Sequence, residues 1–145
     1  MSAGFLLDVN LLIALVRQDH VGHRRAREWF ERVGSHNWAT CAMTEASFVR
    51  IITNPRFLAH PPDIGEAVHM LELLTRLPGH RFWTLDVAFV SAVEPLLERL
   101  FGHQQVTDAY LLGLAISKKG KLATFDKGLK LLAGSKLVNH LELLA

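Results

Sequence analysis

Four carboxylates occupy positions in this sequence that packing alone does not explain. Asp8 ends a short apolar run near the N-terminus, and Asp126 follows an expected strand over 121–124. Glu45 lies near the start of one expected helix, and Asp108 opens another that is strongly apolar. Strand ends and helix N-termini share one edge of the sheet in a parallel α/β fold, where such folds bind their ligands. We therefore expect these four side chains to converge.

A converging set of carboxylates has a specific chemical consequence. Like charges within a few ångströms raise one another's pKa, and a bound divalent cation relieves that repulsion. Oxygen ligands suit Mg²⁺ or Mn²⁺, which activate water and stabilise charge on a phosphoryl oxygen. The pattern therefore indicates metal-assisted hydrolysis of a phosphodiester. Taken singly, Asp108 could simply stabilise the N-terminus of a helix, Asp126 could be a turn residue, and Glu45 could lie on a solvated helix face. The four acids together favour a functional site.

Short strands that alternate with helices must position these side chains. We expect strands over 4–8, 38–41, 81–85 and 121–124, with a last edge strand over 136–138. We expect helices over 10–16, 21–33, 44–52, 63–77, 86–100, 107–116 and 127–132. This alternation predicts a parallel sheet with helices on both faces.

Several of these helices carry their own boundary signals. Asn10, Asp63 and Asp86 are the expected N-cap residues, and Pro95 implies a kink or a restart within the helix that contains it. One apolar stripe of the helix over 63–77 is expected to face the core; it comprises Ile64, Ala67, Val68, Leu71, Leu74 and Leu77.

The composition fits one folded domain over residues 1–145. Half of the residues are hydrophobic and 21% are charged, which excludes a disordered chain. The net charge of +2 and the pI near 8.9 do not repel a polyanion. The single cysteine, Cys41, excludes an intrachain disulfide framework and favours a reduced, cytoplasmic setting. We expect neither a signal peptide nor a membrane span. The mean hydropathy of +0.19 hints at a partner surface.

The order of short motifs along the chain resembles a known family. The motifs are Leu7-Asp8-Val9-Asn10, His23 with Ala26 and Trp29, Thr44-Glu45 with Phe48 and Arg50, Asn54-Pro55, Thr107-Asp108 and Thr124-Phe125-Asp126. Together they resemble the PIN-domain ribonucleases, and most of all the VapC toxins of VapBC toxin–antitoxin pairs. The matching segments span residues 5 to 129, and all four acidic positions are retained.

The resemblance implies a fold, an activity and a set of site residues. The fold would be a three-layer α/β/α sandwich around a mostly parallel sheet of about five strands. The activity would be that of a Mg²⁺- or Mn²⁺-dependent endoribonuclease. Asp8 and Asp108 would bind the metal directly, and Glu45 and Asp126 would act directly or through water. Asn10, Thr107 and Thr124 would hold these ligands by hydrogen bonds.

The resemblance also implies partners. It implies a homodimer, a VapB-like antitoxin that blocks the acidic pocket, and a higher assembly with that antitoxin. Arg50 and Arg17 are candidates for contact with RNA phosphates or with the antitoxin, although such arginines more often form a solvated face. The RNA itself stays open among transfer RNA, ribosomal RNA loops and messenger RNA.

The sequence leaves two other interpretations of these acids open. In a phosphohydrolase of the haloacid dehalogenase type, Asp8 would be the nucleophile and a second aspartate would follow two residues later. Asn10 occupies that position, and the large insertions of that class are missing. In a non-catalytic interaction module the acids would carry no chemistry, which the complete acidic set argues against.

Overall fold

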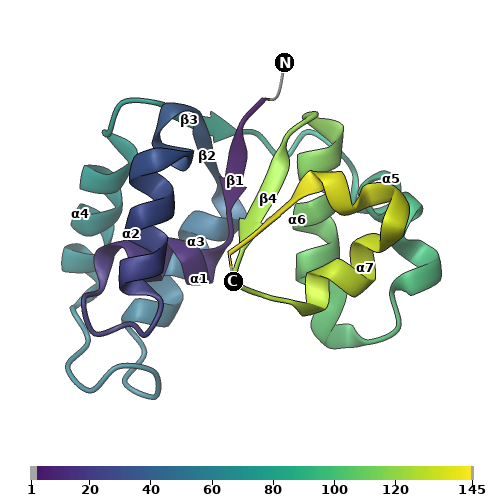
Figure 1. The fold of residues 1–145 in the computed structure, drawn as a ribbon. Coiled ribbons are helices and arrows are strands. Elements are labelled where there is room, and N and C mark those ends of the chain that lie inside the picture. Colours follow the sequence, from purple (N-terminus) through teal and green to yellow (C-terminus); the bar gives the residue numbers. More distant parts are fainter. Residues whose placement is uncertain (1–2, 145) are drawn as a thin grey trace.

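The computed structural model describes residues 3–144, and within them five strands form one sheet in which every neighbouring pair is parallel. The strands follow the order β3-β2-β1-β4-β5 across the sheet, so β1 and β4 lie side by side at its centre (Figure 1). Their bounds are β1 Phe5–Leu7, β2 Trp38–Cys41, β3 His80–Trp83, β4 Lys121–Thr124 and β5 Leu141–Leu143. The expected parallel sheet of about five strands is confirmed.

Helices cover both faces of this sheet and complete the expected three layers (Figure 1). One layer holds α1 Val9–Val16, α2 His23–Arg32, α3 Ala42–Ile52 and α4 Ile64–Thr75. The other holds α5 Phe89–Val93, α6 Val106–Ser117 and α7 Gly128–Leu137. Short 3₁₀ turns complete the described elements at Gly34–His36, Glu94–Arg99, His103–Gln105 and Val138–His140. None of the helices within residues 3–144 is long and apolar enough to cross a membrane.

The three inner strands, β2, β1 and β4, bury alternate residues on the two faces of the sheet. Leu6 and Leu122 pack with α6 and α7, whereas Leu7, Trp38 and Ala123 pack with α1, α2 and α3. Successive side chains of a strand point to opposite faces, and a sheet covered on both sides is apolar throughout. A polar side chain in one of these strands is therefore assigned to a face by its position in the alternation.

Two of the expected N-caps are wrong. Helix α1 begins at Val9, because the Asp8 carboxylate itself accepts the Val9 N–H at 2.8 Å, so Asn10 lies inside the helix. Helix α5 begins only after Ala88, and Asp86 instead accepts two hydrogen bonds from Lys118 Nζ at 2.9 Å. Asn10 is thus displaced as a cap by Asp8, and Asp86 pairs with Lys118 and does not cap α5.

The C-terminal elements also differ from expectation. The strand expected over 136–138 is wrong, because α7 runs through Leu137 after a break at Gly134, where φ is 68°. The last strand forms at Leu141–Leu143 instead. The expected kink at Pro95 is confirmed, since α5 gives way there to the 3₁₀ turn.

Helix α4 is capped as expected but packs less deeply. Asp63 and Glu66 form a reciprocal capping box at its N-terminus. Of the expected inner stripe only Ala67 and Leu74 are buried, and the remaining members are partly or largely exposed. The face of α4 that carries these apolar side chains is therefore available to solvent or to a partner.

Candidate active site

The side chains of Asp8 and Thr124 join the two central strands where both strands end. Thr124 is fully buried at the end of β4 and donates its hydroxyl proton to Asp8 Oδ2 at 2.8 Å. The other oxygen of Asp8 accepts the Val9 N–H at the start of α1. Asp8 is only 7% exposed, so these two bonds fix the orientation of a carboxylate that water hardly reaches.

The loop after β4 places Asp126 beside this pair. The Thr124 oxygen accepts the Asp126 N–H at 3.0 Å, and Asp126 Oδ1 accepts the Gly128 N–H at 2.8 Å. Asp108, half-buried in the first turn of α6, lines a cavity of about 170 Å³ together with Asp126, Leu129 and Leu132. The structure thus brings Asp108 and Asp126 to one pocket next to Asp8.

Burial, together with the proximity of these three acids, raises two of their pKa values. Burial, with smaller contributions from the charges of Asp8 and Asp126, raises the pKa of Asp108 to about 6. Burial also raises the pKa of Asp8, with a smaller contribution from Asp126, against the opposing hydrogen bonds from Thr124 and Val9. The three carboxylates therefore form an electrostatically coupled cluster, which we call the acidic cluster.

Glu45 is held from the opposite face of the sheet. Thr40 follows Trp38 by two residues in β2, so its side chain lies on the α1–α4 face, whereas Thr124 follows Leu122 and lies on the α5–α7 face. The Thr40 hydroxyl donates to Glu45 Oε2 at 2.6 Å. Among the described residues, the charges that raise the pKa of Asp8 and Asp108 come from the acidic cluster and not from Glu45.

The supporting residues expected from the resemblance lie at different depths. Thr124 holds Asp8 directly, as expected for a supporting residue. Asn10 is exposed, with its Oδ1 3.4 Å from His20 Nε2, and Thr107 is exposed in the first turn of α6. Arg17 forms an ion pair with Asp19 at 3.1 Å, and Arg50 is exposed near the end of α3. Their roles toward RNA or an antitoxin stay predictions.

The acidic cluster suits a small divalent cation by its chemistry. Three mutually repelling oxygen donors at the edge of a parallel sheet are stabilised by positive charge. Within residues 3–144, no three His, Cys, Asp or Glu side chains stand close enough to enclose a metal ion by themselves. Mg²⁺ needs only one or two carboxylates and keeps several waters, so the cluster fits this mode of binding and not a closed protein cage.

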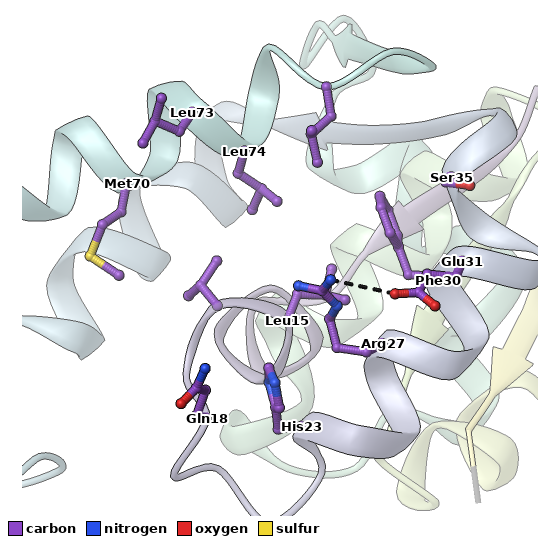
Figure 2. Close-up of a pocket in the computed structure, with 12 residues that line it drawn as sticks. Leu15, Gln18, His23, Arg27, Phe30, Glu31, Ser35, Met70, Leu73 and Leu74 are labelled. Carbon is purple, nitrogen blue, oxygen red and sulfur yellow. Dashed lines mark hydrogen bonds and ion pairs between the residues drawn. The ribbon is translucent and has the colours of Figure 1, made fainter.

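A larger apolar groove lies away from these acids. It measures about 670 Å³ and lies between α1, α2 and α4. Met70, Leu73 and Leu74 lie opposite Leu15 and Phe30 across it, with an Arg27–Glu31 ion pair at 3.4 Å on its wall (Figure 2). No member of the acidic cluster lines it. Its size and apolar lining suit a partner, whereas the small acidic pocket suits chemistry.

The family model for the PIN domain matches residues 5–135. Ribonuclease VapC38 of Mycobacterium tuberculosis is 45% identical over 139 residues, which cover 96% of each chain. Ribonuclease VapC44 of the same organism is 41% identical over 128 residues, or 88% of this chain and 89% of the relative. The chain belongs to the VapC ribonucleases of the PIN-domain family. The expected family is confirmed.

A solved structure agrees with this VapC assignment at the level of the fold. The crystal structure of FitAcB from Neisseria gonorrhoeae aligns with a TM-score of 0.59 over 86% of this chain and 88% of that chain. The sequence identity is 18%, so the likeness concerns the PIN fold alone.

Sequence reasoning missed two side chains beside Glu45. The Thr40 hydroxyl donates to Glu45 Oε2, and its oxygen also lies 2.8 Å from His80 Nε2. A usable signal was present, because a threonine near the end of a buried strand is a polar residue that must find a hydrogen-bond partner. His80 gave no such signal, since it follows Gly79 in an apparent turn.

We predict that Asp108→Asn stabilises the protein in metal-free buffer near neutral pH. The folded state raises the pKa of Asp108 from 3.8 to about 6, so it favours the protonated form. The stability linked to this group is present below about pH 4 and is lost as pH rises through about 6. With allowance for its partial exposure, the gain in unfolding free energy is about 1–2 kcal/mol.

Urea unfolding in EDTA at a series of pH values measures this gain. It should grow between about pH 4 and pH 6 and stay constant above that range. Asp86→Asn is the control of opposite sign, because the hydrogen bond from Lys118 lowers the pKa of Asp86. A gain that does not change with pH, or no gain at neutral pH, would contradict the coupling.

Proposed function

We propose that the protein is the toxin of a VapBC pair and hydrolyses RNA phosphodiester bonds at the acidic cluster. The observation that carries this proposal is the coupled set of Asp8, Asp108 and Asp126 in a chain of the VapC family. Residues 1–145 would act as one PIN domain in the cytoplasm. The haloacid dehalogenase alternative loses its support, since the family model that matches residues 5–135 is that of the PIN domain.

Each residue of the cluster has a distinct task in this proposal. Thr124 and the Val9 N–H hold Asp8 in one orientation, so little reorganisation is needed when substrate binds. Asp108 shares its pocket with Asp126 and supplies the second carboxylate. Glu45 approaches the same sheet edge from the other face, where it accepts from Thr40 and can orient water.

The cluster cannot accept RNA while it is bare. A phosphate approaching three carboxylates meets like charge, so a cation must be present for binding to be favourable. We propose Mg²⁺, with Mn²⁺ as an alternative, held directly by Asp8 and Asp108, directly or through water by Asp126, and only through water by Glu45. When bound, such an ion supplies an activated water and neutralises charge on the phosphoryl oxygens.

The proposed partners are a VapB-like antitoxin and a second copy of the chain. An apolar helix of the antitoxin would fit the groove between α1, α2 and α4, and an arginine from another part of the antitoxin would match the acidic cluster. The homodimer is supported by exposed apolar side chains in α5 and just after the Glu94–Arg99 turn: Phe89 is 44%, Val90 75% and Phe101 86% exposed. Antitoxin binding to such dimers would build a higher assembly.

The first test of the proposed function is an RNA cleavage assay with Mg²⁺ or Mn²⁺. We predict that Asp8→Asn and Asp108→Asn each lower the cleavage rate at least about 100-fold, because each removes a charge that holds the cation. Sequencing the RNA ends then identifies the substrate.

The exposed acid Asp86 provides the matched control, and Asp86→Asn should cleave like the wild type, since it lies outside the cluster and pairs with Lys118. Undiminished cleavage by both cluster variants would refute the mechanism.

The second test concerns the partners. Leu73→Glu places a charge in the groove at a side chain that is 52% exposed, so folding is retained while affinity for the antitoxin from the neighbouring reading frame falls at least about tenfold. Leu131→Glu is the control, because Leu131 is 78% exposed on α7, outside the groove. Equal affinities for both variants would exclude the groove as the antitoxin site.

The proposed homodimer is tested separately, by measuring the mass of the toxin alone with light scattering.

A further inference from the structure

A hydrogen-bond chain of three polar side chains runs from β3 through β2 to α3. His80 Nε2 lies 2.8 Å from the Thr40 oxygen, and the Thr40 hydroxyl lies 2.6 Å from Glu45 Oε2. Thr40 is fully buried, so its hydroxyl depends on these two neighbours for its hydrogen bonds. The three residues come from separate elements and meet only because the sheet is folded.

The chemistry of the three groups determines which of them donates and which accepts in this hydrogen-bond chain. An ionised carboxylate only accepts, so the single hydroxyl proton of Thr40 is donated to Glu45. The Thr40 oxygen is then left as an acceptor, and His80 must donate from Nε2–H. Burial lowers the pKa of His80, against a smaller opposing effect of the Glu45 charge, so the ring is neutral near pH 7 and its Nδ1 carries no proton.

Packing holds the first member of the chain in place. The rings of His80 and Trp38 pack edge to face with centroids 4.7 Å apart, and Trp38 is fully buried. Trp38 and His80 are also paired in the β2–β3 register, with Thr40 two residues along on the same face. The donor nitrogen is therefore presented to Thr40 by the sheet itself.

We propose that Thr40 and His80 are positioning residues that hold the Glu45 carboxylate for RNA hydrolysis, an inference that rests on the proposed function. Glu45 Oε2 is occupied by Thr40, which leaves Oε1 to accept from the attacking water. The acidic cluster approaches the sheet edge from the α5–α7 face and Glu45 from the α1–α4 face. RNA bound at the edge would then meet the cation on one side and this carboxylate on the other.

Kinetics of single variants test the positioning role. Thr40→Val removes the hydroxyl and should lower kcat about 10-fold to 100-fold while KM for RNA stays within about twofold. Thr40→Ser keeps the hydroxyl and should restore kcat to within about threefold of the wild type. His80→Phe keeps a ring against Trp38 and should lower kcat in the same direction. Thr75→Val, which removes a hydroxyl bonded to Leu71 O on α4, is the control and should cleave like the wild type.

A spectroscopic measurement tests this hydrogen-bond chain without any RNA. Nitrogen-15 NMR of the histidine rings near pH 7.5 should show His80 as the Nε2–H tautomer. Thr40→Val should change the His80 signals, whereas Thr75→Val should leave them unchanged. This measurement and His80→Phe decide the matter if Thr40→Val does not fold.

The outcomes separate this inference from the proposed function. A wild type that cleaves no RNA with Mg²⁺ or Mn²⁺ overturns the proposed function. A wild type that cleaves, together with Thr40→Val at the wild-type kcat, overturns only the positioning role. Loss of activity in Thr40→Val that Thr40→Ser does not recover, or an Nδ1–H tautomer of His80, overturns it as well.

Discussion

The hydrogen bond from Thr124 to Asp8 ties the two central strands together at the point where a charge is least tolerated. A nearly buried carboxylate at a strand end is unfavourable unless donors face it, and here one side-chain donor and one backbone N–H do so. The same threonine oxygen accepts the Asp126 N–H, so one hydroxyl orders two acids. Asp108 comes close to these two acids because α6, which carries it, packs on the same face of the sheet as Leu6 and Leu122.

The sheet divides the candidate catalytic groups into two sets. Thr124 lies on the α5–α7 face, two residues after Leu122 in β4, and Thr40 lies on the α1–α4 face, two residues after Trp38 in β2. Each threonine holds one carboxylate, Asp8 on one face and Glu45 on the other. The division keeps Glu45 out of the repulsion that raises the pKa of Asp108, so one set is suited to binding a cation and the other to accepting hydrogen bonds.

The acids could be found from sequence because parallel strands share one carboxyl edge, and the bounds of β2 and β4 follow from short apolar segments. The direction of Glu45 could not, because each helical residue turns by about 100° and a shift of one residue at the start of α3 changes its face. Asp8 as a helix cap was missed because its carboxylate serves two purposes. The last strand was misplaced because Gly134, at φ 68°, breaks α7 and the helix continues beyond it.

The proposed metal site is most directly tested near pH 6, where the acidic cluster is partly protonated until a divalent cation binds. Calorimetry of Mn²⁺ binding in buffers with different ionisation enthalpies measures the protons released. Since the pKa of Asp108 is about 6, roughly half a proton or more should leave per Mn²⁺ at pH 6, and almost none at pH 8. Asp108→Asn should reduce the release at pH 6. Failure to bind Mn²⁺, or a release that is equal at both pH values, would contradict the account.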